Sequence, residues 1–464
     1  MNSLPKELIE SLQSVKGFNE EAFKAVHQSG GQITSIRLNP GKIFNLQSSI
    51  FNDQREKVLW SSCGFYLKER PSFTLDPLFH AGAYYVQEAS SMFLEEALKQ
   101  TVDLSKQLKV LDLCAAPGGK STLIQSIISK DSLLVSNEVI KTRVNVLSEN
   151  ITKWGAANTI VTNNDPSDFK RLPNYFDVIV VDAPCSGSGL FRKDPNAIEE
   201  WSEKNVNLCS QRQQRILSDV FSSLKAGGVL IYSTCSYSPQ EDEEISDWLL
   251  EQFAVYSLQL AIEESWGIIE TISGKNAFGY RFYPDQVKGE GFFIAAFKKR
   301  SSGIEGYGEV KNQKSKGKSQ KKDILTEKEI EGLRPYLNNI SELFFIKQNE
   351  ELIAMPIHLE SELATIQSSL YIKKAGVKLG TMIRNELIPA HDLAVSTIIN
   401  NNIPGIDVDI ETALQYLRKE ELKIESGIKG WVLLTHQYLP IGWIKVMTNR
   451  INNYYPAAWR ILNK

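Results

Sequence analysis

The chain has 464 residues, of which 42% are hydrophobic and 23% are charged, a balance typical of a globular protein that buries several cores. A formal net charge of -3 at pH 7 argues against a protein that coats nucleic acid, and no apolar run approaches the roughly 18 residues that a membrane-spanning helix needs. The N-terminus has no signal-peptide apolar core, so we expect a cytoplasmic protein without a membrane anchor.

A first region, residues 1–105, precedes any regular alternation of strands and helices. Residues 34–40, TSIRLNP, have the composition of a short strand. Residues 82–91, GAYYVQEASS, are predicted to begin a helix, for which we expect a packing role. We interpret this region as a small module with a lead-in helix.

Between residues 106 and 300, short apolar runs alternate with amphipathic stretches. A long amphipathic stretch with helical periodicity covers residues 205–224 and predicts a helix, and we expect Ala226-Gly227-Gly228 to end it. Strands that alternate with helices predict an α/β fold with a doubly wound, Rossmann-like parallel sheet, whose ligands lie at the carboxyl ends of the strands. The predicted strands are LKVLDLC, SLLVSN, NTIVTN, FDVIVVD and GVLIYST.

Polar residues follow the first three of these strands. Glycines in the first turn admit a ligand close to the backbone, and a helix start attracts an anionic group, although a tight connection without a ligand is the plainer alternative. Glu138 follows the second strand, where a carboxylate can accept both hydroxyls of a ribose. Asp165 follows the third and can face an adenine amino group. The pattern indicates an adenosine cofactor. The first turn reads Cys114, Ala115, Ala116, Pro117, Gly118, Gly119 and Lys120.

Two cysteines stand at the ends of the fourth and fifth strands, Cys185 in DAPCSGSG and Cys235 in STCSY. A lone buried cysteine is often only a small apolar residue, but two at neighbouring strand ends indicate chemistry in one cleft. None of the five cysteines forms a Cys-x-x-Cys pair, so the sequence predicts neither a metal site nor a disulfide framework.

A thiol beside a methyl donor has a specific use. C5 of cytosine is too weak a nucleophile to take a methyl group from S-adenosylmethionine, whereas attack of a thiolate on C6 makes C5 nucleophilic. An acid near N3 is needed as charge builds on the ring, and Asp182 is the local candidate if it holds a proton. After methyl transfer, a second thiol near the adduct could assist release of the attacking thiol from C6. The residues themselves leave open which cysteine attacks.

The C-terminal part begins with residues 301–323, which are rich in Lys, Gly, Ser and Gln and predict a flexible basic linker. We expect an intermediate α+β region at 324–400 and a compact β domain at 401–464. Aromatic and basic residues interleave there, which suits RNA contact, yet a small β domain also needs aromatic core residues, and we expect at least half of them to be core. The aromatic residues are Trp431, Tyr438, Trp443, Tyr454, Tyr455 and Trp459.

The motifs LCAAPGGKSTLIQ, SNE, NND, VDAPCSGSGLFRKDP and YSTCSY together resemble those of the Sun family of RNA (cytosine-5) methyltransferases. FHAGAYYVQEASSMFLEEAL and RFYPDQVKGEGFFIAAFKK extend the resemblance over roughly residues 1–300, and the ending GWVLLTHQYLPIGWIKVMTNRINNYYPAAWRI resembles the PUA-like domain of RsmF-type members. The resemblance implies methylation of cytosine C5 in RNA, most closely 16S ribosomal RNA in the small ribosomal subunit, with S-adenosylmethionine as cofactor. We expect a monomer.

The resemblance also implies which cysteine attacks. It assigns Cys235 as the nucleophile and Cys185 as the residue that assists breakdown of the adduct. DNA cytosine-5 methyltransferases instead attack with the cysteine of a Pro-Cys motif. Lys193, in RKDP, could contact substrate or help order the loop, or be an ordinary surface lysine. Arg37, in the RNA-binding module that the resemblance implies, could touch phosphate or cap a structural turn.

For the cofactor, the resemblance assigns residues 114–120 to the methionine end of S-adenosylmethionine, Glu138 to its ribose and Asp165 to its adenine. Asp182 is assigned to the cofactor side of the cleft and to the target base. These roles agree with the positions of the same residues at the predicted strand ends.

Other functions share part of the pattern. A nicotinamide-dependent oxidoreductase is opposed by the missing G-x-G-x-x-G and by the paired cysteines. Methylation of a base amino group needs no adduct and commonly places an aromatic after Asp/Asn-Pro-Pro, where this chain has DAPC. A catalytically silent ribosome-assembly factor that binds RNA is opposed by the intact Cys235, Cys185, Asp182 and Glu138. The same reaction on transfer RNA stays open.

Overall fold

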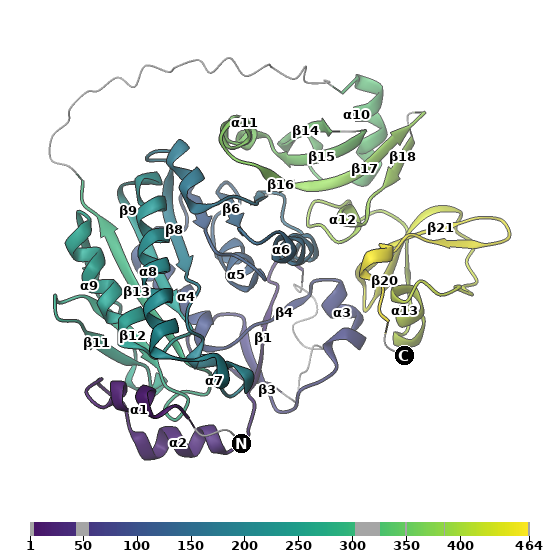
Figure 1. The fold of residues 1–464 in the computed structure, drawn as a ribbon. Helices are drawn as coiled ribbons and strands as arrows, with labels where there is room; N and C mark the ends of the chain where they lie inside the picture. The colour runs from purple at the N-terminus through teal and green to yellow at the C-terminus, as the bar shows by residue number, and fades with distance from the viewer. Residues whose placement is uncertain (1–3, 43–54, 302–324, 349, 385, 463–464) are drawn as a thin grey trace, which may run out of the picture.

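The computed structural model describes residues 4–42, 55–301, 325–348, 350–384 and 386–462 (Figure 1). Four β-sheets form within these residues, and the largest lies at the centre of the chain. The predicted linker, residues 301–323, falls outside the described residues except for Ser301. In the part of the chain that the structure describes, no helix is both long and apolar enough to span a membrane.

The central sheet has ten strands in the order β11-β12-β13-β9-β8-β5-β6-β7-β16, with β10 paired to β13. The neighbours β5–β6, β5–β8, β6–β7 and β8–β9 are parallel, which confirms the predicted Rossmann-like α/β fold. The parallel strands are β5 (Lys109–Asp112), β6 (Leu133–Asn137), β7 (Thr159–Thr162), β8 (Phe176–Asp182) and β9 (Leu224–Thr234). Antiparallel strands extend it: β10 (Val255–Leu258), β11 (Ile269–Ile272), β12 (Phe278–Phe282) and β13 (Phe292–Lys299).

Successive residues of the parallel strands enter two different cores, one on each face of the sheet. Leu111 and Ile179 belong to one core and their neighbours Val110 and Val178 to the other. Both faces are therefore covered, which explains the continuous apolar runs in the sequence. The covering helices are α4 (Leu94–Thr101), α5 (Gly119–Ile127), α6 (Lys141–Trp154), α8 (Glu203–Val220) and α9 (Glu243–Gln252), and a short α7 (Asn196–Glu200) precedes α8.

The N-terminal region forms its own sheet in the order β2-β3-β1-β4. The strand expected at residues 34–40 is β1. The helix expected to begin within residues 82–91 starts later, because Tyr84 and Val86 pair with β1 as strand β4 and helical turns begin only at Ser90. The elements are α1 (Lys6–Leu12), α2 (Glu20–Gln28), β1 (Thr34–Leu38), β2 (Arg55–Lys57), β3 (Gly64–Leu67), α3 (Pro77–His80) and β4 (Tyr84–Val86).

The region beyond the linker is joined to the central sheet. Strand β16 (Ile372–Ala375) pairs antiparallel with the edge strand β7, and Ile366 of α11 packs into the core of the central sheet. Gly376, with a φ of +49°, separates β16 from β17, which belongs to another sheet. That sheet and its helices are α10 (Glu327–Leu333), β14 (Leu343–Gln348), β15 (Glu351–Pro356), α11 (Glu360–Ser369), β17 (Val377–Ile383), β18 (Glu386–Pro389) and α12 (His391–Ala394).

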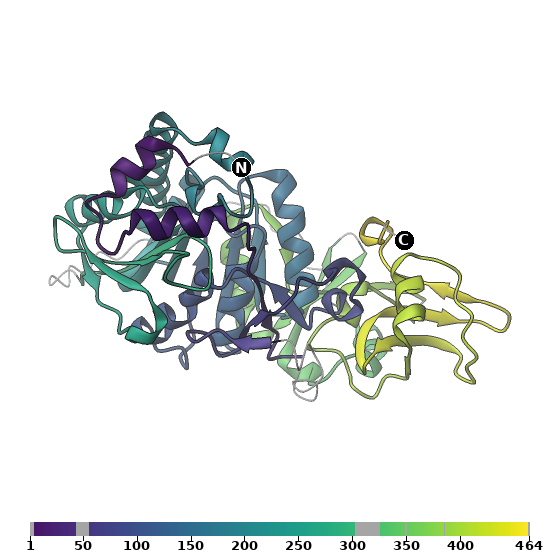
Figure 2. The same cartoon turned by 90° about the horizontal axis from the view of Figure 1, so that it is seen from below.

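The C-terminal sheet lies at one end of an elongated molecule, away from α1 and α2 (Figure 2). Trp443 and Tyr455 are buried in cores, whereas Tyr438 is 84% exposed. Trp431 and Trp459 are partly buried against the same cores, so most of the interleaved aromatic residues stabilise the fold. The elements are β19 (Gly405–Asp407), α13 (Ile410–Leu417), β20 (Gly430–His436), β21 (Leu439–Val446) and β22 (Ile451–Asn453).

One predicted boundary was wrong. Helix α8 ends at Val220, and the glycines at 227 and 228 lie within β9. They occupy an irregularity in the β8–β9 pairing, where the register shifts between Phe176 and Val178, and Gly227 has a φ of +74°. Glycine here allows a bulge in a strand; the helix has already ended.

Candidate active site

The predicted site residues gather at one edge of the central sheet, because the carboxyl ends of parallel strands point the same way. Strand β5 ends at Asp112, β8 at Asp182 and β9 at Thr234, so the first turn and both cysteine loops start from adjacent strands. Strands β6 and β7, which precede Glu138 and Asp165, are the next two in the sheet.

The first turn is held from helix α6. Arg143 donates from Nη2 to the Ala116 carbonyl at 2.6 Å, and Asn150 donates to the Pro117 carbonyl at 2.8 Å. Gly118 has a φ of +118°, which favours glycine, and α5 begins directly after it. No side chain of the described residues caps α5, so its first N–H groups are available to an anionic group.

Asp112 is an acid that the sequence analysis did not single out. Its side chain is fully buried; Oδ2 accepts from Ser121 Oγ at 2.6 Å, while Oδ1 has no hydrogen-bond partner among the described residues. The pKa of Asp112 is raised to about 7, mainly by burial and also by the charges of Asp182 and Glu138, against the opposing effects of the Ser121 hydrogen bond and Lys120. The signal in the sequence was an acid at the end of the first strand, directly before the glycine turn.

Lys120 forms an ion pair with Asp182, with 2.8 Å between Nζ and Oδ2. The other carboxylate oxygen of Asp182 accepts from Ser233 Oγ at 2.9 Å. Burial would lower the pKa of Lys120, but Asp182 and Asp112 raise it above the usual range, so the ammonium stays charged. The pair joins the glycine turn to the end of β8, and the side chain of Asp182 remains about one-third exposed, at 34%.

The two predicted cysteines meet, with 2.9 Å between Cys185 Sγ and Cys235 Sγ. Both are partly exposed. The pKa of Cys185 is raised well above the usual range, first by its contact with the Cys235 sulfur and then by burial. The contact therefore favours a proton shared at the two sulfurs, and a protonated Cys185 is suited to hold that proton next to Cys235.

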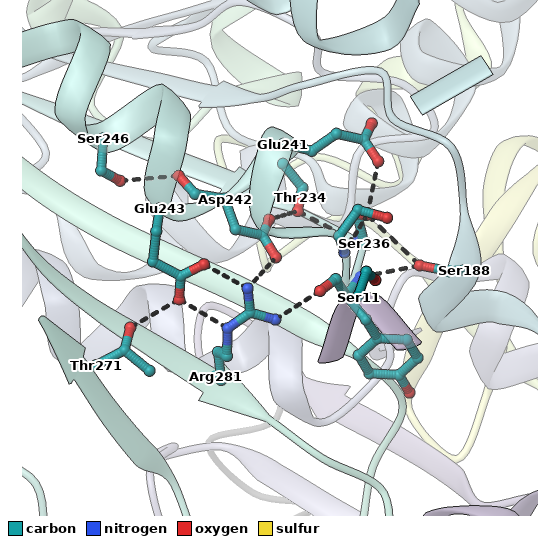
Figure 3. A network of polar contacts seen from close by, with 12 residues as sticks. Ser11, Ser188, Thr234, Ser236, Glu241, Asp242, Glu243, Ser246, Thr271 and Arg281 are labelled. Atoms are coloured by element: carbon teal, nitrogen blue, oxygen red, sulfur yellow. Dashed lines mark hydrogen bonds and ion pairs between the residues drawn. The ribbon is translucent and has the colours of Figure 1, made fainter. Parts of the chain in front are cut away.

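The backbone around Cys235 is anchored on both sides (Figure 3). Thr234 Oγ1 donates to Asp242 Oδ1 at 2.6 Å and accepts from the Ser236 N–H at 3.2 Å. Arg281, on β12, lies 3.2 Å from Asp242 Oδ2 and donates from Nη1 to the Tyr237 carbonyl at 2.8 Å. Sequence analysis gave no role to Arg281 or Asp242; the hints were the acidic run QEDEE shortly after STCSY and the position of Arg281 as the first residue of RFYPDQVKGEGFFIAAFKK.

Glu138 and Asp165 lie where the strand order predicted, and both also have structural partners. Glu138 is 3% exposed; its Oε1 accepts from the Ile140 N–H at 2.9 Å, and its Oε2 lies 3.5 Å from Arg143. Asp165 Oδ1 accepts from the Ser167 N–H at 3.0 Å and so caps the helical turn after β7. Oxygens remain on both for a ligand, since each carboxylate accepts up to about four hydrogen bonds.

The two candidates for substrate contact differ in exposure. Lys193 is exposed on the turn after the Cys185 loop. Arg37 is 1% exposed and donates to Gln87, Thr122 and the Gly119 carbonyl, so it ties β1 to the start of α5. This burial favours the structural alternative for Arg37 over a contact with RNA phosphate.

The carboxyl-end edge of the central sheet thus carries the start of α5, which no described side chain caps, and the three carboxyl groups of Asp112, Glu138 and Asp182. The charges of Asp182 and Glu138 both act on Asp112; Lys120 opposes this effect, and Arg143 lies 3.5 Å from Glu138. A ligand with a carboxylate at one end and positive charge beside it fits this arrangement. In the described ranges, no group of three or more His, Cys, Asp or Glu residues is arranged to hold a metal ion.

Three family models match consecutive parts of the chain. The N-terminal domain of 16S rRNA methyltransferase RsmF matches residues 4–89, 16S rRNA methyltransferase RsmB/F matches residues 99–298, and the methyltransferase RsmF PUA domain matches residues 403–461. The first and last therefore flank a matched segment that contains both cysteine loops.

Individual proteins show the same likeness over nearly the whole chain. A ribosomal RNA small subunit methyltransferase F from Pectobacterium atrosepticum is 30% identical over 98% of this chain and 95% of its own length. One from Vibrio vulnificus is 28% identical over 98% of this chain and 97% of its own. The crystal structure of a methyltransferase homolog protein from Pyrococcus horikoshii is 28% identical, with a TM-score of 0.50, and covers 64% of this chain and 100% of that one.

Proposed function

This chain belongs to the RsmF-type family of 16S rRNA methyltransferases, and we propose that it methylates C5 of a cytidine in 16S ribosomal RNA with S-adenosylmethionine as the methyl donor. The observation that carries the proposal is the contact of two thiols, 2.9 Å apart, at strand ends next to the Lys120–Asp182 pair. C5 methylation of cytosine needs a thiol that attacks C6 and groups that offset charge on the ring.

The residues at the sheet edge suit the cofactor. The start of α5 would hold its carboxylate, Glu138 its ribose hydroxyls and Asp165 its adenine, as the family resemblance implies. Asp112 has a buried oxygen that accepts no hydrogen bond from the described residues, and it is suited to the positively charged amino group of the methionine end. When bound, S-adenosylmethionine supplies an electrophilic methyl group.

Cys235 acts as the nucleophile. Its thiolate adds to C6 of the cytosine, the C5–C6 double-bond electrons move onto the ring, and C5 becomes able to form a new bond to carbon. We assign Asp182 to the base side of the cleft, where its carboxylate holds the Lys120 ammonium, and the positive charge of Lys120 offsets the negative charge that builds at N3. The fixed backbone on both sides of Cys235 orients the sulfur.

Cys185 acts at release. Once C5 carries the methyl group, solvent water accepts the C5 proton, the electrons of that C–H bond re-form the C5–C6 double bond, and the C6–S bond breaks so that Cys235 leaves as a thiolate. The raised pKa of Cys185 keeps its thiol protonated, and its sulfur lies 2.9 Å from the leaving sulfur, so it can donate a proton to it. Loss of this donor should slow release and leave the protein attached to RNA.

The remaining parts of the chain serve recognition of the RNA. We assign residues 1–105 to an N-terminal RNA-binding module, 106–300 to catalysis, and 401–464 to a PUA-like RNA-binding domain, with 324–400 between them and 301–323 as a linker. We assign Lys193, which is exposed on the turn after the Cys185 loop, to contact with the substrate backbone. The enzyme acts as a cytoplasmic monomer on the small ribosomal subunit or its RNA.

The test of this function is a comparison of substrates. Wild-type protein is incubated with S-adenosylmethionine and with 5-methylcytosine-free 16S rRNA, small ribosomal subunits or transfer RNA, and bisulfite sequencing then locates the modified cytidines. Methylation of 16S rRNA, free or in the subunit, supports the proposal. Methylation of transfer RNA alone would show that transfer RNA, and not 16S rRNA, is the substrate. RNA binding without methylation would favour a silent assembly factor.

A further inference from the structure

Both cysteine loops contact one buried carboxylate, Glu241, in the turn between β9 and α9. Figure 3 shows its contact with Ser236. Its side chain is fully buried. Glu241 Oε1 accepts from the Ser186 N–H at 2.8 Å and from Gln213 Nε2 at 3.0 Å, and Oε2 accepts from Ser236 Oγ at 2.6 Å and from Ser186 Oγ at 2.5 Å. Ser186 and Ser236 are the direct neighbours of Cys185 and Cys235.

We propose that Glu241 is a positioning residue that ties the two cysteine loops together, so that both thiols act on the same base. The inference rests on the proposed function, since it concerns how the two thiols are held. One carboxylate contacts both neighbouring serines, and any change in its position moves both sulfur-bearing loops at once.

Glu241 acts through the serines and not on the substrate. A carboxylate has about four sites for accepting hydrogen bonds, and four donors from three residues already occupy them. Its backbone is fixed as well, since Tyr232 donates to the Glu241 carbonyl at 2.6 Å. Gln213 donates to the Pro184 carbonyl at 3.0 Å and thereby links the residue before Cys185 to the same group.

The geometry separates a positioning role from a role of the charge. In Glu241→Gln, the amide oxygen can replace Oε1 and keep the Ser186 N–H and Gln213, while the amide nitrogen can donate to the two serine hydroxyls, which accept as well as donate. In Glu241→Ala, every one of these contacts is lost. Glutamine should therefore preserve the arrangement of the loops, and alanine should not.

The experiment compares four purified proteins: wild type, Glu241→Ala, Glu241→Gln and Glu244→Gln. Glu244 is exposed near the start of α9, three residues after Glu241, and serves as the matched control for loss of one acid. Each protein is assayed for methyl transfer to 16S rRNA over a range of RNA concentrations and pH values, and for binding of S-adenosylhomocysteine by calorimetry.

We expect kcat of Glu241→Ala to fall roughly 100-fold with little change in KM for RNA, because misplacement of a reacting group by about 1 Å costs that much. Glu241→Gln should stay within about tenfold of wild type with the same pH profile, and Glu244→Gln should match wild type. Equal impairment of the glutamine and alanine variants, or a normal Glu241→Ala enzyme, would overturn the inference.

If Glu241→Ala does not fold, the double variant Ser186→Ala/Ser236→Ala supplies the test, because it keeps the carboxylate and removes both hydroxyls that reach it. A loss in kcat of about tenfold or more is expected, and an unchanged kcat would overturn the inference. A wild-type protein that methylates no RNA would overturn the proposed function itself, whereas an active wild type with unaffected variants would overturn only the role of Glu241.

Discussion

Replacement of Arg281 by methionine should destabilise the protein strongly, because it removes a cation from a buried acidic cluster. Arg281 is 1% exposed, and its Nη2 contacts Glu243 Oε2 and lies 3.2 Å from Asp242 Oδ2. Methionine keeps most of the stem but leaves two buried carboxylates without their partner. Breaking such a pair costs about 3–5 kcal/mol of unfolding free energy, which should lower Tm by roughly 6–20 °C.

The loss should depend on pH. Burial raises the pKa of Asp242 while Arg281 lowers it, and Arg281 holds the pKa of Glu243 below its usual range in spite of burial. Without Arg281 both pKa values rise in the folded protein. A carboxyl whose folded pKa exceeds its unfolded pKa makes the folded state bind protons more tightly, so the variant regains stability as pH falls. The destabilisation should be largest at about pH 8 and smaller near pH 5.

Urea unfolding of wild type and variant at both pH values measures the effect. Arg334→Met is the matched control, since Arg334 forms an exposed pair with Glu331 at 2.7 Å and its loss should cost less than about 1 kcal/mol. The reasoning would be refuted by an Arg281→Met variant that loses less than about 1 kcal/mol, or whose loss is the same at both pH values.

Three further predictions concern the sheet edge and the N-terminal module. The pKa of Asp112 is raised to about 7, mainly by burial, so affinity for cationic S-adenosylmethionine should rise as pH increases through this value. In calorimetry, Asp112→Asn should weaken binding about tenfold and remove the pH dependence of the affinity. Equal behaviour of the two proteins would argue against a role of the Asp112 carboxylate in binding. Gly118→Ala should lose about 1–3 kcal/mol in urea unfolding, because φ is +118° and the new Cβ would lie 3.3 Å from Leu147 Cδ1; an unchanged midpoint would disprove the strain. Arg37→Met should lose at least about 1.5 kcal/mol of unfolding free energy and leave RNA affinity unchanged in filter binding. Unchanged stability with weaker RNA binding would instead support a contact between Arg37 and RNA phosphate.

The parallel strands were predictable because each is buried on both faces and appears in the sequence as a continuous apolar run. The pairing of β16 with β7 was not, because Ile372 and Thr162 are far apart in sequence and no local pattern specifies a distant edge strand. Residues 84–86 were assigned to a helix for a similar reason: their strand conformation comes from pairing with β1.

The site was predictable where it depends on strand ends and motifs. Cys185, Cys235 and Asp182 follow directly from the strand order, and the structure brings them together. Groups that act through distant partners were missed or misread. Glu241 becomes informative only when Ser186 and Ser236 fold onto it, and Arg37 is structural only because α5 packs against its strand.

The most direct test of the account is to identify the cysteine that becomes attached to RNA. Cys185→Ala protein is incubated with S-adenosylmethionine and with 16S rRNA that contains 5-fluorocytidine, whose C5 fluorine blocks release; after nuclease and protease digestion, mass spectrometry locates the modified peptide. The account predicts a methylated nucleotide on Cys235 and no adduct for Cys235→Ala. A nucleotide on Cys185 in the Cys235→Ala protein, or methylation by Cys235→Ala, would contradict it.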